Sequence, residues 1–435
     1  MTISATGPYA ALRIPDFRNF ILARLCVTLA IQIQATVVGW QVYKITGEPF
    51  ALGLIGLAEA IPAISVSLYA GHVADMVDRK KIILGAVSIL VVAASALLFF
   101  SLEPEQFMLK YGVIPIYAVI FCTGFARGFL SPANFSFMPQ LVPRNLYMNA
   151  VSLNSTFWEA ASIGGPLMAG LIYGFAGHVP GLDYKETLHI DPEDAGLIAA
   201  YLTDALLMAG GLIFYFSIPN KPVPPSTAEQ GVVEKITAGL RFVFKNQIVL
   251  SAISLDLFAV LFGGAVALLP VFAKDILHVG PEGLGLLRAA SSVGAVSTAV
   301  LITHYPLKKH MGNVLLLCVG GYGLCMIAFG LSTSFWLSVF ILMMSGACDA
   351  VSVIIRGTLI QTLTPENMKG RVAAVNSMFI GSSNEIGAFE SGTAARLMGV
   401  VPSVIFGGCM TLIVVSITGW RAKKLRQLDT IKHEH

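Results

Sequence analysis

Apolar residues fill this 435-residue chain in long runs that are separated by short polar segments. A helix of roughly 20 apolar residues crosses about 30 Å of hydrocarbon, because an α-helix rises about 1.5 Å per residue. The pattern predicts an all-α membrane protein with twelve membrane-spanning helices. We expect them at residues 20–43, 52–74, 82–102, 113–130, 150–175, 196–218, 248–272, 284–302, 314–331, 336–355, 372–397 and 401–420.

The longest polar interruption divides the twelve segments into two groups of six. Inside it, Val233, Ile236, Leu240 and Val243 fall on one helical face, which predicts an amphipathic helix on the inner leaflet. The expected parts are an N-terminal six-helix half at 1–218, a cytoplasmic linker at 219–247, a C-terminal six-helix half at 248–421 and a basic tail at 422–435.

The composition agrees with a membrane protein, since 55% of the residues are hydrophobic and only 12% are charged, where a soluble domain has roughly a quarter charged. Lys and Arg gather in alternate loops, which predicts that both termini are cytoplasmic in a bacterial inner membrane. The net charge of +3 is then a topology signal and does not indicate a nucleic-acid partner. All six cysteines fall inside predicted spans without a CxxC pair, so we expect neither a disulfide framework nor a metal site.

A polar motif links the second and third predicted spans, where Gly71, Asp75, Arg79 and Lys80 follow one another at short spacing. Glycine allows helix ends to approach closely, and a carboxylate is favoured beside the positive N-terminal end of a helix. The motif resembles the loop signature of the major facilitator superfamily, although Met76 and Asp78 replace a basic residue and a glycine of the usual pattern. The resemblance implies two six-helix bundles around a central cavity, with this loop as a latch in one conformational state.

Further segments in the same order resemble the exporter branch of this superfamily, which includes siderophore exporters and macrolide efflux pumps. Within the fifth span, Gly165 and Pro166 resemble a pattern of antiporters and predict a bend or a tight helix contact. In the fourth span, Arg127 matches a basic residue of the family; it could bind substrate anions, influence a proton-binding carboxylate or pair with Asp75. The other similar segments are 131–133, 139–143, 153–155, 239–243 and 364–371.

Polar residues at helical spacing inside the spans predict the faces that line the working interior. Arg24, Thr28 and Gln32 form a stripe on the first helix, and Ser155 and Glu159 lie on one face of the fifth. The remaining cavity-lining candidates are Arg288, Asp349, Asn376 and Ser383.

Buried carboxylates are candidates for proton coupling, because low dielectric favours the neutral acid and lets the group bind and release a proton. The candidates are Glu159, Glu390, Glu385 and Asp256. The alternative for each is a structural ion pair or a helix–helix contact.

These features favour proton-coupled export of an amphipathic small molecule, either a siderophore-like metabolite or a drug, by alternating access. Two alternatives stay open: uptake of a nutrient or ion on the same fold, and a membrane scaffold or sensor that transports nothing. We do not expect an enzyme, catalytic residues or a cofactor, since the chain lacks a nucleophile–base set, a P-loop and an HExxH motif. The expected partners are the substrate, protons and the lipid bilayer, with the chain as a monomer.

Overall fold

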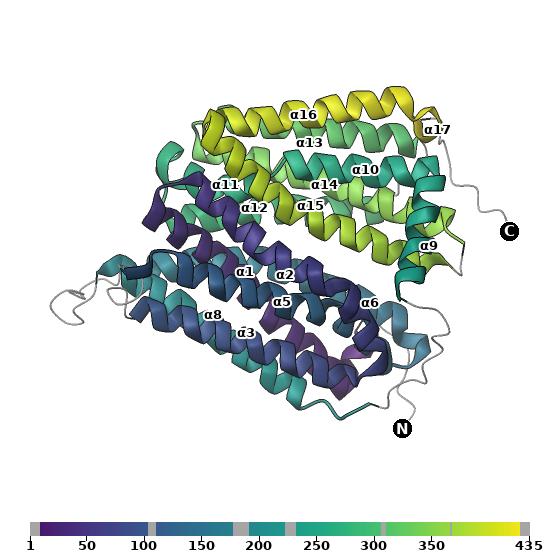
Figure 1. Cartoon of the computed structure of the whole chain (residues 1–435), viewed down its shortest axis with the longest axis horizontal. Coiled ribbons are helices and arrows are strands. Elements are labelled where there is room, and N and C mark those ends of the chain that lie inside the picture. Colours follow the sequence, from purple (N-terminus) through teal and green to yellow (C-terminus); the bar gives the residue numbers. More distant parts are fainter. Residues whose placement is uncertain are drawn as a thin grey trace. The chain divides into compact units, whose positions relative to one another are not determined.

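The computed structural model describes residues 9–102, 110–176, 191–221, 232–305, 310–365 and 368–426, and every regular element in these ranges is helical. In the first half the long helices are α1 (Pro15–Thr46), α2 (Pro49–Met76), α3 (Arg79–Leu102), α5 (Ile114–Phe137), α6 (Tyr147–Ala176) and α8 (Pro192–Phe216). The remainder contains α9 (Val232–Lys245), α10 (Gln247–Phe262), α11 (Ala265–Val271), η4 (Phe272–Ile276), α12 (Pro281–His304), α13 (Met311–Leu331), α14 (Phe335–Leu363), α15 (Lys369–Met398), α16 (Val400–Arg421) and α17 (Lys423–Arg426) (Figure 1).

Helices occupy all twelve segments that the sequence predicts, which confirms the all-α membrane fold. Ten spans in the described residues are long and apolar enough to cross a bilayer. The two expected spans outside these ten are α6 and α15, which are 30 residues each and carry polar faces. The number twelve therefore stays a prediction.

The seventh expected span, 248–272, is not one continuous helix. It is interrupted at Gly263 and Gly264 between α10 and α11, and it continues into the π-helical turn η4. Two consecutive glycines weaken a helix, and the freed carbonyl of Gly263 accepts a hydrogen bond of 3.0 Å from the Tyr322 hydroxyl. A Cβ at Gly264 would lie 2.5 Å from Ser391 Oγ, so the interruption also lets α15 approach closely.

The chain forms two compact units. The first comprises residues 1–47, 58–227 and 280–289, and the second comprises 48–57, 228–279 and 290–435. The start of α2 thus packs within the second unit, and the start of α12 packs within the first.

Both units contain the same four helix pairs. In the first, α1 packs on α6 and α8, and α3 packs on α5 and α8; in the second, α10 packs on α15 and α16, and α13 packs on α14 and α16 (Figure 1). Each unit is therefore built on one repeated plan, as expected for duplicated halves.

The core of the first unit contains Phe20, which makes edge contacts with Phe137 and Tyr215. These three side chains are essentially inaccessible to solvent. They join α1, α5 and α8, so the apolar stripes of three helices meet in one packed layer.

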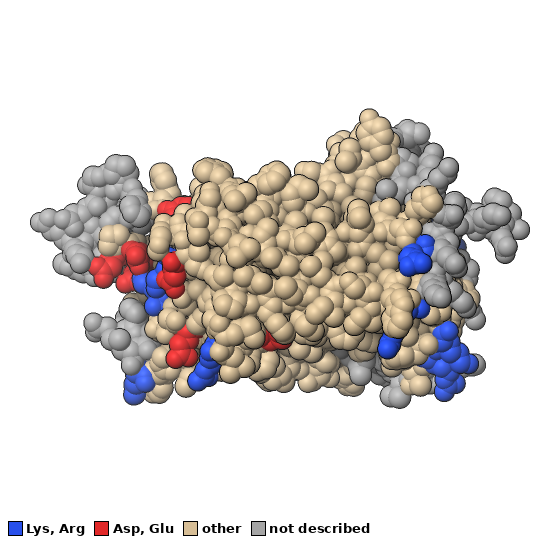
Figure 2. Space-filling model, turned by 90° about the horizontal axis from the view of Figure 1, so that it is seen from above, with Lys and Arg blue, Asp and Glu red and all other residues tan. Residues whose placement is uncertain are grey.

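On the face that Figure 2 shows, charged residues gather toward the two sides of the view, and few charged residues lie between them. An apolar band flanked by charge is what a bilayer requires of the surface that faces lipid.

The predicted linker helix is present as α9, and it packs on α10 and α15. Val243 is buried against Val249, Ile253 and Val372, whereas Phe244 is exposed. Part of its apolar face therefore covers protein, and the exposed phenyl ring remains available for the headgroup region.

Candidate functional site

A shallow groove lies between α1 and α6 in the first unit. Arg24 and Thr28 of the polar stripe on α1 meet Asn154 and Trp158 of α6 there. The apolar part of its wall is formed by Ile21, Leu25 and Phe157. The structure thus places two predicted cavity residues, Arg24 and Thr28, beside the amide of Asn154 and the aromatic ring of Trp158 in one site.

Two polar groups in this region lack internal partners. The Oδ1 of Asn154 is buried and accepts no hydrogen bond within the described residues. Glu159, five residues farther along α6, is half-buried and forms no ion pair in the described part of the chain. Ser155 lies between them and is exposed.

Tight packing holds α1 and α6 together beyond the groove. A Cβ at Gly165 would lie 3.2 Å from the carbonyl oxygen of Leu29 and would collide with Gln32, so only glycine fits there. Gln32 therefore packs on the helix that carries Pro166. Gly165 thus packs closely on α1, and the bend expected at Pro166 stays a prediction.

The first turns of α12 pack on the same part of α6. A Cβ at Gly285 would lie 2.5 Å from the carbonyl oxygen of Pro166 and 3.1 Å from the Cα of Gly170. Farther along α12, Arg288 Nη1 lies 3.5 Å from Thr36 Oγ1 of α1, and its buried Nε has no partner among the described residues.

The predicted latch is described only in part. Gly71 and Asp75 lie in the last turns of α2, and their side chains are outside the described part of the structure. Lys80 is buried, and its Nζ donates a 3.0 Å hydrogen bond to the carbonyl oxygen of Phe216 at the end of α8. Lys80 therefore caps the carbonyl end of a helix in its own unit. The role of the loop as a latch stays a prediction.

Arg127 on α5 forms an ion pair with Glu59 on α2. A Cβ at Gly124 would meet the backbone of Glu59, so the glycine one turn before Arg127 allows this approach. Glu59 is thus one carboxylate partner of Arg127. Because the Asp75 side chain is outside the described part of the structure, the pairing of Arg127 with Asp75 stays a prediction.

In the second unit, Asp256 on α10 forms an ion pair with Arg356 on α14. The two side chains are 8% and 4% exposed, so the pair is almost completely buried. Because the permanent cation of Arg356 stabilises the ionised form of Asp256, a structural ion pair is favoured over proton exchange at this residue.

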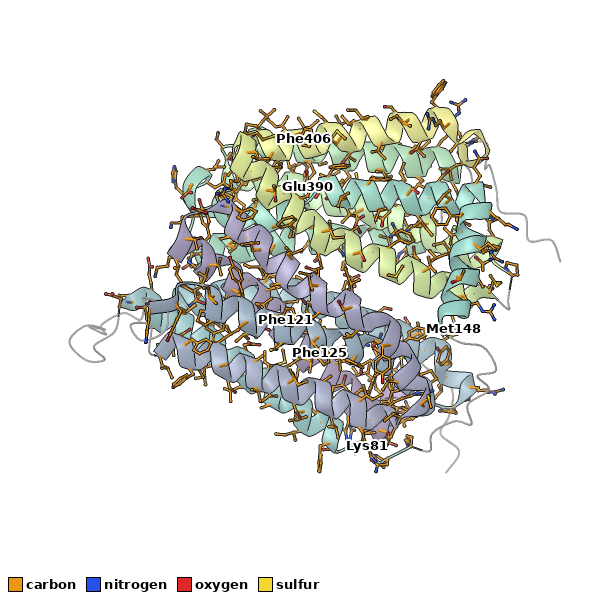
Figure 3. All side chains as sticks on the ribbon, in the orientation of Figure 1. Lys81, Phe121, Phe125, Met148, Glu390 and Phe406 are labelled. Carbon is orange, nitrogen blue, oxygen red and sulfur yellow. The ribbon has the colours of Figure 1, made fainter. Side chains whose placement is uncertain are left out.

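Glu390 lies on α15 and is half-buried (Figure 3). It accepts a 3.5 Å hydrogen bond from Ser391 Oγ, the atom that faces the interruption between α10 and α11. Glu385 lies toward the start of α2, because a Cβ at Gly56 would lie 3.7 Å from its Oε2. Glu390 is thus next in sequence to the residue that contacts the interruption between α10 and α11.

The other candidates of the second unit lie on two different helices. Asp349 is on α14, and Asn376 and Ser383 are on α15. Asn376 Oδ1 is buried without a partner in the described residues, whereas Ser383 is buried and donates to the carbonyl oxygen of Ile380. The Oδ1 of Asn376 is therefore an acceptor that is free for a ligand.

Sequence reasoning missed Asp204, which lies in the middle of α8 and is 0% exposed. The available signal was a lone acid inside an apolar run, at residues 196–218. No group of three or more His, Cys, Asp or Glu side chains in the described ranges could hold a metal ion.

The family model of the Major Facilitator Superfamily matches residues 20–388. The chain belongs to the major facilitator superfamily. It is accordingly a multi-pass secondary transporter and not an enzyme.

The curated relatives include the protein named "Enterobactin exporter EntS" of Shigella dysenteriae serotype 1, at 27% identity over 92% of this chain and 90% of the relative. The protein of the same name from Citrobacter koseri is 26% identical over the same shares. Among solved structures, the inward-open xylose transporter XylE from E. coli has a TM-score of 0.69 at 12% identity and covers 96% of this chain and 98% of its own. That likeness shows the shared fold.

Proposed function

We propose that this transporter exports an amphipathic, aromatic and anionic small molecule across the bacterial inner membrane, driven by the inward flow of protons. The observation that carries the proposal is the groove between α1 and α6, where Arg24 and Trp158 line one site. The similarity to proteins named enterobactin exporters over 92% of the chain supports the direction and the class of solute.

The groove offers three complementary contacts. The guanidinium of Arg24 is always charged and binds carboxylates or phenolates in a planar fork. Trp158 presents an aromatic face for stacking. The unpartnered Oδ1 of Asn154 accepts a hydrogen bond from a hydroxyl group. An aromatic anion that carries hydroxyl groups, such as a siderophore-like metabolite, satisfies all three.

Glu159 supplies a proton site on the same helix. Its half-buried carboxylate lies one residue from Trp158. A conformational change that alters the exposure of this carboxylate would change its affinity for a proton, so Glu159 could bind a proton on one side of the membrane and release it on the other. We infer alternating access for the chain, with both termini cytoplasmic as the basic loops predict.

The test uses everted vesicles that hold a proton gradient and a panel of siderophores, macrolides and other amphipathic compounds. Substrate entry into the vesicles together with protein-dependent loss of the gradient is expected for an aromatic anion. Arg24→Gln should raise KM by about tenfold or more, because a charge-assisted hydrogen bond contributes about 1.5–3 kcal/mol.

Trp158→Leu should also raise KM, whereas Trp336→Phe is the matched control, since Trp336 is an exposed residue at the start of α14. Transport without gradient loss would refute the proton drive. Unchanged kinetics in both groove variants would remove the groove from substrate binding, and accumulation in the opposite direction would indicate uptake.

A further inference from the structure

Among the described residues of the first unit, the most deeply buried carboxylate is that of Asp204, which lies outside the groove. Its side chain is inaccessible to solvent, and neither Oδ1 nor Oδ2 has a hydrogen-bond partner within the described residues. The other carboxylates differ, since Glu59 and Asp256 have arginine partners and Glu159 is half-buried.

The depth of Asp204 follows from two close helix contacts. A Cβ at Gly211 would lie 2.6 Å from Val27 of α1. The hydroxyl of Tyr201 bonds Gln41 of the same helix, so α1 and α8 run antiparallel. Seven residues back along α8, from Gly211 to Asp204, correspond to seven residues forward along α1, from Val27 to Gln34. Gln34 therefore lies at about the same depth as Asp204.

Two more unpartnered polar atoms lie in this layer. Gln34 Nε2 is buried on α1 and donates no hydrogen bond in the described part of the chain. Gly196 packs on Tyr173 of α6, and the same count along these antiparallel helices places Asp204 about one turn from Ser162. Ser162 Oγ is likewise buried without a partner. Three helices thus each contribute an unsatisfied polar group at a similar depth.

The helices packed on α8 bring little charge to this layer. No charged residue lies between Arg24 and Lys44 on α1, or between Lys81 and Leu102 on α3. Arg24 is ten residues from Gln34, or about 15 Å along the helix. The titratable groups of α6 are Tyr147, Glu159 and Tyr173, and those of α8 besides Asp204 are Glu193, Asp194, Tyr201 and Tyr215.

Arg288 is a cation at this depth, but it approaches α1 from another side. It contacts Thr36, which lies about 200° around the helix from Gln34, and the structure records no ion pair between Arg288 and Asp204. An ionised carboxylate in hydrocarbon without a cation costs several kcal/mol, so a proton is the ligand that this site requires.

Polar groups connect this layer to the charged end of α8. Tyr201 lies one turn from Asp204 and within its electrostatic reach, and its hydroxyl donates a 2.7 Å hydrogen bond to Gln41 Oε1. Tyr173 lies close to Tyr201 on the next helix. At the helix end, Lys44 Nζ is 2.6 Å from Glu193 Oε2.

We propose that Asp204 is a proton-binding site inside the N-terminal half, which exchanges its proton with the Lys44–Glu193 end of the bundle along Tyr201 and Gln41. One proton added to an Oδ atom makes the side chain neutral, and its release restores the carboxylate. This proposal adds a second proton site to the proposed proton coupling. The role of Asp204 in transport rests on the proposed function, whereas proton binding by Asp204 does not.

The test is infrared spectroscopy of the full-length protein in lipid vesicles. Wild type should show the carbonyl stretch of a protonated carboxylic acid at neutral pH, and Asp204→Asn should lose a band equivalent to one acid per chain. Asp16→Asn is the matched control and should leave the band unchanged, because Asp16 forms an ion pair with Lys221. When the protein is transferred to heavy water, the band should shift as deuterium replaces the proton on Asp204. Tyr201→Phe should slow this shift, because the proposed route uses the Tyr201 hydroxyl.

Several results would overturn the proposal. The first is an acid band that is identical in wild type and Asp204→Asn. The second is an acid band that sodium ions abolish at constant pH, because this would indicate that the site binds a metal cation. Asparagine has the shape of a protonated aspartate, so a failure of Asp204→Asn to fold would also count against it. The wild-type pH titration needs no variant, and absence of the acid band there overturns the proposal. None of these infrared measurements needs a transport substrate. Their outcome therefore does not depend on the outcome of the efflux assay, and the two proposals can fail independently.

Discussion

The buried ion pair between Asp256 and Arg356 allows a quantitative test of the second unit. Three variants are needed: Asp256→Leu, Arg356→Met and the double variant Asp256→Leu/Arg356→Met. Each single change removes one charge and leaves the other in a site where the side chains are 8% and 4% exposed. The double change replaces both charges with apolar groups that suit the surrounding helices.

The expected magnitudes follow from this burial. Loss of one partner of a buried pair costs about 3–5 kcal/mol, because the remaining charge stays out of water without compensation. Replacement of both partners by apolar groups is often neutral or stabilising. The double variant should therefore be more stable than either single variant, with a coupling free energy of about 3 kcal/mol or more.

The assay is reversible unfolding in mixed micelles, from which the free energy of unfolding of all four proteins gives a double-mutant cycle. The matched control is the pair of Arg127 and Glu59, whose side chains are 39% and 17% exposed. Its coupling should be smaller, since exposed ion pairs contribute about 1 kcal/mol or less. Single-variant losses below about 1 kcal/mol that simply add in the double variant would refute the reasoning.

Three further predictions concern the first unit and proton coupling. Lys80→Gln should lower the free energy of unfolding by about 1.5–3 kcal/mol, because the charged hydrogen bond to the Phe216 carbonyl is lost. Lys81→Gln at the exposed neighbouring position should have little effect in the same assay. Equal losses in the two variants would argue against the cap. Gly211→Ala should destabilise by about 1–3 kcal/mol because its Cβ would lie 2.6 Å from Val27 Cγ2, whereas Gly210→Ala meets nothing within 4 Å and should be neutral or stabilising; thermal denaturation in detergent compares the two. Glu159→Gln and Glu390→Gln should each alter the pH dependence of transport at normal expression, because an amide cannot exchange a proton, and a pH profile identical to wild type in both would exclude these residues as proton sites.

Much of the helical framework could be predicted from the order of apolar segments. Length and hydropathy suffice for this, because a membrane span must satisfy its backbone hydrogen bonds within its own helix. The segment at 248–272 shows the limit of the method. Its apolar run is continuous, but Gly263 and Gly264 interrupt the helix and receive Tyr322 and Ser391 from other helices.

The candidate site was predictable only in part. The stripe of Arg24 and Thr28 was visible from helical spacing, because residues three and four apart share a face. Its meeting with Asn154 and Trp158 depends on the packing of α1 on α6, which no local pattern specifies.

The sequence by itself determined the class of the protein: an α-helical membrane transporter of a recognisable superfamily, with ionisable groups inside its spans. Only the tertiary structure decided which partner each of these ionisable groups has. Arg127 has Glu59, Asp256 has Arg356, and Asp204 has no partner in the described chain. The physical reason is that hydropathy and helical period depend on neighbours within one or two turns. The charge of a buried carboxylate depends instead on side chains that are far away in sequence and are brought to it only by helix packing.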